Sequence, residues 1–418
     1  MIVRWIQMVA DNIQNAKCVA VICEYNPLHN GHAYHISRIR NEVGDNGCIL
    51  GIMSGNFTQR GEPAIIPKYE RALAAIKSGM DLVVELPFPF SSAYAETFAD
   101  GGVYIAERLG AGALSFGSEL GDPATLEYLA DISLSDEFIS AYESNRELRG
   151  SAAFYETLAS VAGISYSIKP NDILGIQYIR SIRRNGYKIK PSVILRNGAG
   201  YNEASLSDCA DESGEKFTSA KAIREYLKTG KASFEKLEKY MPDAMCELLE
   251  NSISNGEFII GYKSIENVIM THFRLMSGLA FSEIADVPSG FSKRLHDAAL
   301  HSRSFEEMCQ TLCNRSFTLS RLLRIILYCL TGVKKTDMDT GIIGYVNLLA
   351  ANDNGRKYMA DLRRQDSFIL TKPSDCRLLF PGAERQTALA ENADALYTAM
   401  MPKCRDAGYF MRKKPYIV

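Results

Sequence analysis

The chain has 418 residues, of which 46% are hydrophobic and 23% charged, and its formal net charge is −2. This balance is typical of a folded globular protein and argues against a largely disordered one. The small negative charge excludes a protein that binds nucleic acid over its whole surface, so any such binding must use a local basic patch. A chain of this length is expected to form two domains.

The cysteines and the N-terminal sequence bear on the cellular compartment. Ten cysteines are scattered along the chain without a Cys-x-x-Cys pair, and no nearby histidine completes a zinc site around Cys309 and Cys313. Such scattering is typical of reduced thiols in a cytoplasmic protein. Residues 1–17 make a poor signal peptide, and no run approaches the roughly 18 apolar residues that span a bilayer. We therefore expect a cytoplasmic protein without membrane segments, with residues 1–17 as an N-terminal extension.

From residue 18 onward, short apolar runs alternate with helix-like segments. The apolar runs predict strands at 18–23, 48–54, 81–87, 113–119 and 188–196. The intervening patterns predict helices at 32–42, 68–79, 95–110, 171–186 and 218–230. This alternation predicts an α/β, Rossmann-like domain with a parallel sheet over residues 18–230. Ligands of such sheets bind beyond the carboxyl ends of the strands, so we expect the site in the loops that follow them.

The pattern of hydrophobic residues changes near residue 231. Helical periodicity dominates the rest of the chain, and strand signals are sparse until the last sixty residues. We therefore predict that residues 231–418 form a mostly helical region with a small mixed part at its end.

Three of the six histidines, His29, His32 and His35, lie just after the first predicted strand. His29 and His32 form a His-x-Gly-His pattern at a strand-to-helix turn. The Asn30–Gly31 pair favours a positive φ and close approach of the backbone to a ligand. The next helix offers free N–H groups to an anion, and the two imidazoles could stabilise charge that grows on phosphate oxygens. The alternatives are a metal pair or histidines that only pack.

No other phosphate-binding loop competes with this turn, because the chain has no Gly-x4-Gly-Lys-Ser/Thr motif and no Gly-x-Gly-x-x-Gly motif after a strand. A second candidate begins the helix at 218–230, where Ser219, Lys221 and Arg224 could hold further phosphates. Its alternative interpretation is an ordinary helix N-cap.

Four separated motifs, CEYNPLHNGHAYH, SGNFTQRGEPAIIPKYERALAAIKSGMDLVVELPFPFSSAYAETFADGG, LSFGSE and NDILGIQYI, occur in this order. Together they resemble the bacterial tRNA(Met) cytidine acetate ligases of the His-x-Gly-His nucleotidyltransferase superfamily. The resemblance is dense over residues 18–230 and thinner beyond. It implies a nucleotidyltransferase domain over 18–230 that binds ATP and a tRNA-binding region over 231–418.

The resemblance also implies a set of site residues. His29 and His32 would be catalytic, on the phosphates of ATP. The ATP-binding residues would be Ile22, Cys23, Glu24, Tyr25, Asn26, Pro27, Leu28, His29, Asn30, Gly31, His32, Ala33, Tyr34, His35, Gly117, Asn171, Arg196 and Ser219. The segment around Ser219 looks like a degraded form of the superfamily's Ile-Ser-Ser-Thr-x-Ile-Arg signature, because Ala220 and Lys221 replace hydroxyl residues.

The activity that the resemblance implies has two steps. ATP activates acetate as acetyl-adenylate with release of pyrophosphate, and the acetyl group passes to the exocyclic amine of the wobble cytidine of elongator tRNA(Met). Mg²⁺ is the expected helper of the first step, no protein-bound metal is expected, and no obligate protein partner is implied. The alternatives are a nucleotidyltransferase that makes a stable adenylylated small molecule and a non-catalytic RNA-binding relative.

Two basic segments are candidates for contact with RNA. One comprises Arg315, Arg321 and Arg324, at roughly helical spacing, and the other comprises Arg412, Lys413 and Lys414 near the C-terminus. Tyr409, Phe410 and Tyr416 accompany the second segment, and rings beside basic residues suit single-stranded RNA. The alternative for both segments is a solvated surface.

Overall fold

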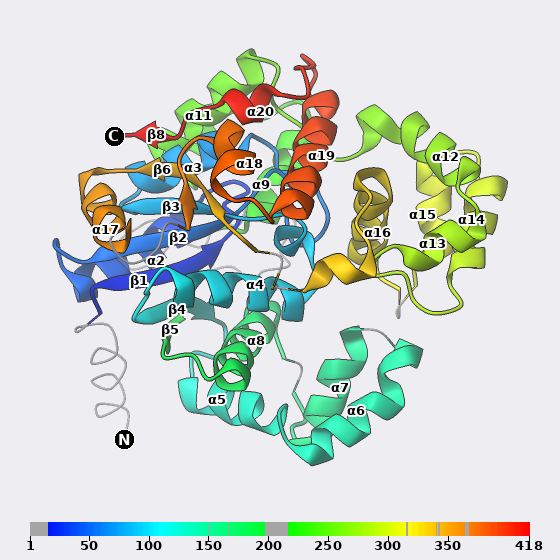
Figure 1. Ribbon diagram of the computed structural model, residues 1–418, viewed down its shortest axis with the longest axis horizontal. Helices are drawn as coiled ribbons and strands as arrows, with labels where there is room; N and C mark the ends of the chain where they lie inside the picture. Colours follow the sequence, from blue (N-terminus) through cyan, green and yellow to red (C-terminus); the bar gives the residue numbers. More distant parts are fainter. Residues whose placement is uncertain are drawn as a thin grey trace.

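A computed structural model describes residues 16–149, 151–166, 168–196, 216–314, 317–339, 341, 343–363 and 368–418. Within these residues one sheet of eight strands runs through the molecule in the order β5-β4-β1-β2-β3-β6-β7, and β8 pairs with β6. Figure 1 shows this sheet at the centre of one half of the molecule, with helices in front of it and around it.

The first five strands are parallel and agree with the sequence-based prediction. They are β1 (Cys18–Cys23), β2 (Cys48–Ser54), β3 (Leu82–Leu86), β4 (Ala113–Ser118) and β5 (Lys190–Leu195). Both faces of the sheet are buried: Val19 and Val21 belong to the core on one face, and Ala20 belongs to the core on the other. Continuous apolar runs are the pattern expected of strands covered on both sides.

Helices cover the two faces. The predicted helices are observed as α2 (Asn30–Val43), α3 (Lys68–Lys77), α4 (Ala95–Arg108), α8 (Pro170–Asn185) and α9 (Ala220–Lys228). The short helix η1 (Phe90–Ser92) follows β3, and three helices that we did not predict lie between β4 and α8, namely α5 (Pro123–Ile132), α6 (Asp136–Arg149) and α7 (Ser151–Val161). Helices α2 and α3 pack on one face through Ile36, Ile39 and Ile76, whereas α4 and α8 pack on the other.

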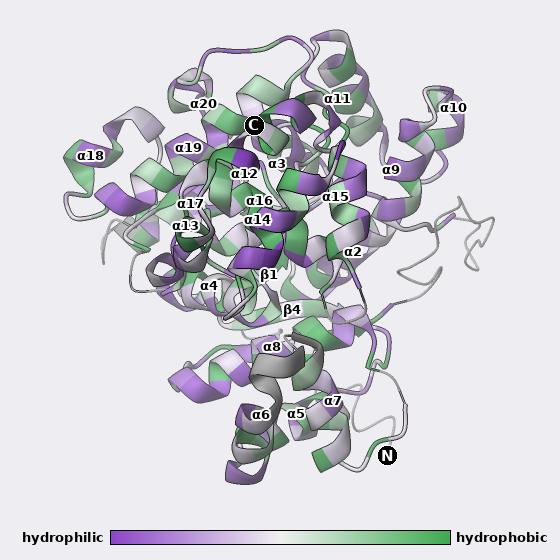
Figure 2. Cartoon of the chain, turned by 90° about the vertical axis from the view of Figure 1, so that its right-hand side faces the viewer, coloured by the Kyte–Doolittle hydropathy of each residue, from purple (hydrophilic) through white to green (hydrophobic). Residues whose placement is uncertain are grey.

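The C-terminal region is mostly helical, as predicted. Its helices are α10 (Phe234–Leu237), α11 (Asp243–Ser254), η2 (Lys263–Ile265), α12 (Glu266–Leu275), α13 (Gly278–Glu283), α14 (Ser292–His301), α15 (Phe305–Leu312), α16 (Leu319–Thr331), η3 (Lys335–Met338), α17 (Asp353–Arg363), η5 (Pro373–Asp375), α18 (Cys376–Leu379), α19 (Glu384–Met400) and α20 (Tyr409–Arg412). Helices α12 to α15 gather away from the sheet, as Figure 1 shows. Helices α14 and α15 carry hydrophilic beside hydrophobic residues in Figure 2.

The same region also returns to the sheet. It supplies β6 (Val346–Ala351), β7 (Ile369–Leu370) and β8 (Tyr416–Ile417), and β6 pairs antiparallel with β3. The sheet therefore crosses residue 230, where the sequence led us to place a domain boundary. One hydrophobic core joins β1 and α3 to α16 and α19. Among the described residues, no helix is both long and apolar enough to cross a bilayer.

The shared core predicts the effect of a cavity in β6. Leu349 is fully buried in the core that joins the two parts of the chain. Leu349→Ala should lower the free energy of unfolding by about 2–5 kcal/mol, because the cavity removes packing on both sides of the junction. Urea unfolding followed by circular dichroism would measure the change.

The matched control is Leu378→Ala in α18, where the side chain is 81% exposed and a change within about 0.5 kcal/mol is expected. Two separate unfolding transitions, only one of which responds to Leu349→Ala, would contradict a core shared across residue 230.

Candidate active site

A cleft opens at the carboxyl ends of β1, β4 and β5, beside the point between β1 and β4 where the strand order reverses. The residues predicted to bind ATP that line it are Ile22, Cys23, Glu24, Tyr25, Asn26, His29, His32, His35, Gly117, Asn171, Arg196 and Ser219. Segments far apart in the sequence therefore meet at one place. The other residues of the predicted loop, Pro27, Leu28, Asn30, Gly31, Ala33 and Tyr34, do not line the cleft.

Three of these non-lining residues support the turn from behind. Leu28 is fully buried in the core. The Asn30 side chain donates to the backbone oxygens of Lys216 and Lys239, at 3.1 Å each. Tyr34 packs edge-on against the ring of Phe217. Their role in this structure is to hold the start of α2 in place beside the cleft.

His29 and His32 form the centre of the cleft. Their rings are stacked, with centroids 3.7 Å apart. The backbone N–H of Gly31 donates to Nδ1 of His29 at 3.1 Å, and the backbone N–H of His29 donates to Nδ1 of His32 at 3.3 Å. These reciprocal hydrogen bonds form a capping box in which two imidazoles take the place of the usual hydroxyl and carboxylate.

The capping box fixes which ring nitrogen carries the proton. A neutral imidazole has one donor and one acceptor nitrogen, so a ring whose Nδ1 accepts a hydrogen bond carries its proton on Nε2. Both rings therefore present an Nε2–H donor, next to the positive end of α2. Neutral donors of this kind can bind phosphate oxygens without the cost of burying two more charges.

The charge states agree with this geometry. Burial lowers the pKa of His29 to about 3, with a further contribution from Arg196. Burial and the neighbouring His29 hold the pKa of His32 well below its ordinary value. Burial also lowers the pKa of His35 to about 4, and its Nε2 lies 2.9 Å from Oγ of Ser115. All three rings are therefore neutral at pH 7.

The role that we expected for Gly31 needs correction. Gly31 lies in the first turn of α2 and does not have a positive φ; instead Tyr25, just after β1, has φ of 48°. A side chain at position 31 would bring its Cβ to 3.0 Å from Cε1 of His29. The glycine thus leaves room for the stacked ring, whereas the strained left-handed residue is Tyr25.

The far side of the cleft comes from β4, α8 and β5. A Cβ at Gly117 would lie 3.0 Å from Cγ of Arg196, so the glycine lets the Arg196 side chain lie against the end of β4. Asn171 donates from Nδ2 to Oε1 of Glu119 at 2.6 Å, which fixes the orientation of its amide. Gly117, Asn171 and Arg196, which the resemblance assigned to ATP, are far apart in the sequence and thus lie together in the cleft.

Helix α9 adds positive charge. The hydroxyl of Ser219 accepts from the backbone N–H of Ala222 at 3.0 Å, so Ser219 is the N-cap that the sequence indicated and also lines the cleft. Lys221 lines the cleft as well. Arg224 lines it and donates to the backbone oxygen of Asn26 at 2.8 Å, which ties α9 to the loop after β1.

Several residues of the cleft were not predicted from the sequence. Those in the loop after β2 are Thr58, Gln59, Arg60 and Glu62, and those in the walls are Val21, Phe98, Ser115, Phe116, Leu174 and Tyr178. The position of this loop at the carboxyl end of a strand was a signal for its role, but no pattern distinguished its individual side chains. Glu24 accepts from the backbone N–H of Gln59 at 2.6 Å, and burial raises its pKa.

Arg71 of α3 was also missed, and it holds two loops together. Its guanidinium is fully buried and donates to the backbone oxygens of Glu24, Ser54, Gly55 and Ile66. The first three of these carbonyls lie at the carboxyl ends of β1 and β2. A buried carbonyl without a donor costs free energy, so Arg71 fixes the spacing of the two loops that form the cleft.

The predicted RNA-contacting residues have different surroundings. Arg321 and Arg324 do not form an exposed face: both are ion-paired with Asp286, and their side chains are only 17% and 9% exposed. This corrects the expectation for the two residues, because their side chains are largely buried against Asp286. Arg315 lies outside the described residues.

The C-terminal basic segment is partly structural. Lys413 donates to Oε1 of Glu70 at 2.9 Å, and its side chain is 23% exposed. The Phe410 ring is buried, which corrects the expectation that it lies beside RNA bases. Arg412 is exposed and paired with Asp406, and Lys414 is exposed.

The neutral histidines predict how stability depends on pH. The unfolded chain takes up protons on histidine below about pH 6.5, whereas folded His29 does so only near pH 3. Its stabilising contribution is therefore present above pH 6.5 and is lost as the pH falls toward 3, by about 1.4 kcal/mol per pH unit. The free energy of unfolding, measured by urea titration at several pH values between 7 and 5, should change less steeply with pH in His29→Asn. Asparagine keeps an acceptor at this position but cannot titrate. Equal slopes for the two proteins would contradict a buried neutral His29.

The chain was compared with known proteins. The family model described as HIGH Nucleotidyl Transferase matches residues 16–409. The tRNA(Met) cytidine acetate ligase of Acetivibrio thermocellus is 32% identical over 412 residues, which cover 94% of this chain and 97% of the relative. That of Anoxybacillus flavithermus is 32% identical over 360 residues, with 83% and 87% covered.

Solved structures agree with this match. The crystal structure of Thermotoga maritima TmcAL without ligand has a TM-score of 0.85 and 28% identity, and the match covers 96% of this chain and all of that one. A second structure of the same protein, bound with alpha-thio ATP, has a TM-score of 0.83. The sequence match over nearly the whole chain and the shared fold lead to one conclusion: the chain belongs to the tRNA(Met) cytidine acetate ligase family of HIGH nucleotidyl transferases.

Proposed function

We propose that this protein is an ATP-dependent ligase that activates acetate as acetyl-adenylate and transfers the acetyl group to the wobble cytidine of elongator tRNA(Met). The observation that carries the proposal is the pair of stacked, neutral imidazoles whose Nδ1 atoms are both occupied by backbone donors. Relatives that cover most of this chain are named for this activity, and a similar structure holds an ATP analogue. A cytoplasmic location, where ATP and tRNA are available, is part of the proposal.

In the first step, a carboxylate oxygen of acetate attacks the α-phosphorus of ATP and pyrophosphate leaves. Acetate is ionised near pH 7 and needs no base, so the protein must position it in line and balance the charge of the triphosphate. The Nε2–H donors of His29 and His32 perform this task together with the cationic side chains of Arg196, Lys221 and Arg224. All five residues line the cleft. Neutral and cationic donors together stabilise the charge that moves onto the leaving pyrophosphate.

Mg²⁺ would enter the cleft bound to ATP. The described part of the chain has no group of three or more His, Cys, Asp or Glu residues arranged to hold a metal ion. Mg²⁺ is commonly bound through substrate phosphates and one or two carboxylates, and Glu24 and Glu62 are the carboxylates in the cleft. The ion would supply additional neutralisation of the phosphate charge.

In the second step, the exocyclic amine of cytidine attacks the acetyl carbon and AMP leaves. The base must be turned out of its stack to reach the cleft. Among the predicted RNA-contacting residues, Arg412 and Lys414 keep exposed side chains and are the ones we retain for phosphate contact.

His32→Ala should lower the rate of acetyl-adenylate formation by at least about 100-fold, because it removes a donor to the transition state. Acetate-dependent release of pyrophosphate from ATP measures this rate. His301→Ala is the matched control, since His301 is exposed on α14, and it should leave the rate unchanged. An unchanged rate in His32→Ala would refute the role of the histidine pair.

Incubation of the protein with ATP and labelled acetate, with and without total tRNA, separates the proposal from its alternatives. The proposal requires pyrophosphate and labelled RNA. Pyrophosphate without labelled RNA would indicate a different acceptor, and neither product would indicate a non-catalytic RNA-binding protein.

A further inference from the structure

Behind the cleft, four polar side chains from distant parts of the chain meet in the interior. Asn56, Lys68, Glu85 and Asp394 are only 3%, 2%, 5% and 7% exposed. Lys68 of α3 donates from Nζ to both carboxylates, at 2.9 Å to Glu85 and 2.9 Å to Asp394. The side-chain amide of Asn56 donates to Oδ1 of Asp394 at 2.8 Å. We call these four residues the buried cluster.

The buried cluster holds the base of one loop. Residues 55–62, here termed the cleft loop, follow β2 and place Thr58, Gln59, Arg60 and Glu62 in the cleft. Asn56 fixes this loop through three groups: its Nδ2 binds Asp394, its Oδ1 accepts from the backbone N–H of Lys68 at 3.0 Å, and its carbonyl accepts from Ala64 at 2.9 Å.

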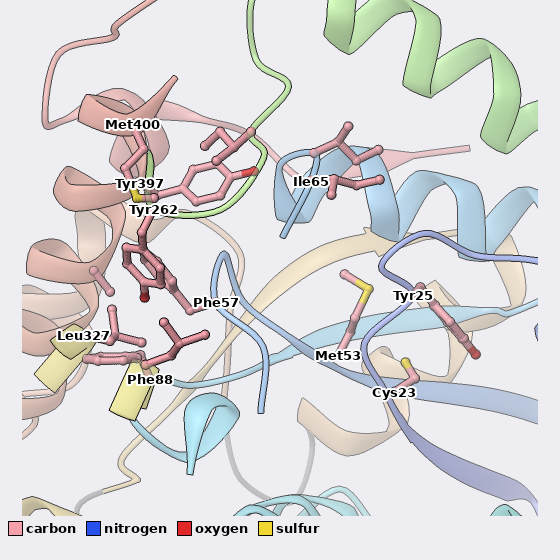
Figure 3. Close-up of a cluster of buried hydrophobic side chains, with 14 of the residues drawn as sticks. Cys23, Tyr25, Met53, Phe57, Ile65, Phe88, Tyr262, Leu327, Tyr397 and Met400 are labelled. Atoms are coloured by element: carbon pink, nitrogen blue, oxygen red, sulfur yellow. The ribbon is translucent and has the colours of Figure 1, made fainter. Parts of the chain in front are cut away.

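The C-terminal region clamps the same loop at other points. Figure 3 shows Phe57 in a buried apolar cluster with Tyr262, Tyr397 and Leu327. The hydroxyl of Tyr262 donates to the backbone oxygen of Gly61 at 2.5 Å, and that of Tyr397 donates to the backbone oxygen of Ala64, two residues after the loop, at 2.8 Å. The cleft loop is therefore positioned by residues that lie 200 to more than 300 positions later in the chain.

Stability alone does not account for the buried cluster. Burying ions is costly, and apolar side chains of similar volume often stabilise a core as well or better. The cluster instead fixes hydrogen-bond directions at a single point, the amide of Asn56. Such networks define one geometry when every member is satisfied.

The cleft loop lies on the side of β1 away from the nucleotide residues. Gly117, Asn171 and Arg196 come from β4, α8 and the end of β5, whereas the cleft loop follows β2 on the other side of β1. The Arg60 guanidinium and the Gln59 side-chain amide are donors that suit a small carboxylate, whereas the Thr58 hydroxyl already donates to the backbone oxygen of Glu62 at 3.1 Å. Two acidic side chains also line the cleft: Glu24 accepts from the backbone N–H of Gln59 at 2.6 Å, and a carboxylate oxygen of Glu62 lies 3.6 Å from the guanidinium of Arg224.

We propose that the cleft loop forms the acid-binding wall of the cleft, and that Asp394 of α19 is a positioning residue that fixes this wall through Asn56. This inference rests on the proposed function, and it goes beyond it by assigning the carboxylate substrate to Gln59 and Arg60. It also gives the C-terminal region a part in the adenylation step, before any RNA is bound.

The test compares Asp394→Asn and Asn56→Ala with the double variant N56D/D394N. The double variant keeps the total charge and reverses the direction of the hydrogen bond, since the amide then donates from position 394 to a carboxylate at position 56. Acetate-dependent pyrophosphate release gives KM for acetate and kcat, and calorimetry with α,β-methylene-ATP gives Kd for the nucleotide. Circular dichroism checks that each variant is folded.

Both single variants should raise KM for acetate by at least about tenfold, with Kd for the nucleotide changed less than about twofold. The double variant should recover most of the loss. Asp337→Asn is the matched control: Asp337 of η3 is buried, and it pairs with Arg385, which belongs to α19 as Asp394 does. It should lower stability and leave KM for acetate unchanged.

Equal changes in acetate KM and nucleotide Kd, or an unchanged acetate KM in folded Asn56→Ala, would overturn the inference. If Asp394→Asn does not fold, Asn56→Ala and the double variant decide the outcome. Failure of the proposed function is distinguishable, because the wild-type protein would then release no pyrophosphate in response to acetate.

Discussion

The cleft depends on one local arrangement, the reciprocal hydrogen bonds between two histidines and the backbone at the start of α2. These bonds occupy Nδ1 of His29 and of His32, stack the rings, and leave one N–H donor on each ring. Burial keeps both rings uncharged. The site can therefore offer directed donors to a polyanion while the cations that balance its charge come from other segments, Arg196 at the end of β5 and Arg224 in α9. This division suits a reaction in which negative charge moves along a triphosphate.

Around this turn, α3 has an unusual role for a helix that packs on a sheet. Neither of its two buried cations, Arg71 and Lys68, forms a simple ion pair with a single carboxylate. Arg71 satisfies carbonyls at the ends of β1 and β2, and Lys68 joins Glu85 of β3 to Asp394 of α19. Helix α3 thus holds the two loops of the cleft and helix α19 in place. Together with β6 in the sheet, this gives a physical reason why the family model extends over residues 16–409 and does not end with the parallel strands.

Local sequence patterns predicted much of this fold and part of the site. The five parallel strands were predictable because burial on both faces produces short apolar runs, and the histidine turn because its residues are adjacent in sequence. Features that depend on distant partners were not. The burial of Arg324 depends on Asp286, and the position of the cleft loop depends on Asp394, which lies more than 330 residues after it. The reason for Gly31 also became visible only with the ring of His29 in place, since its φ is not positive.

Catalysis by this cleft requires that His29 and His32 be neutral rings with the proton on Nε2, and that these protons face the phosphates of ATP. The most direct measurement is the ¹⁵N chemical shift of the ring nitrogens in the ¹⁵N-histidine-labelled protein, with and without a non-hydrolysable ATP analogue, assigned with single histidine variants. At pH 7 we expect both rings to show a protonated Nε2 and an unprotonated Nδ1, and we expect the analogue to shift the Nε2 signals of both. Rings protonated on Nδ1, doubly protonated rings in the free protein, or Nε2 signals that do not respond to saturating nucleotide would contradict this expectation.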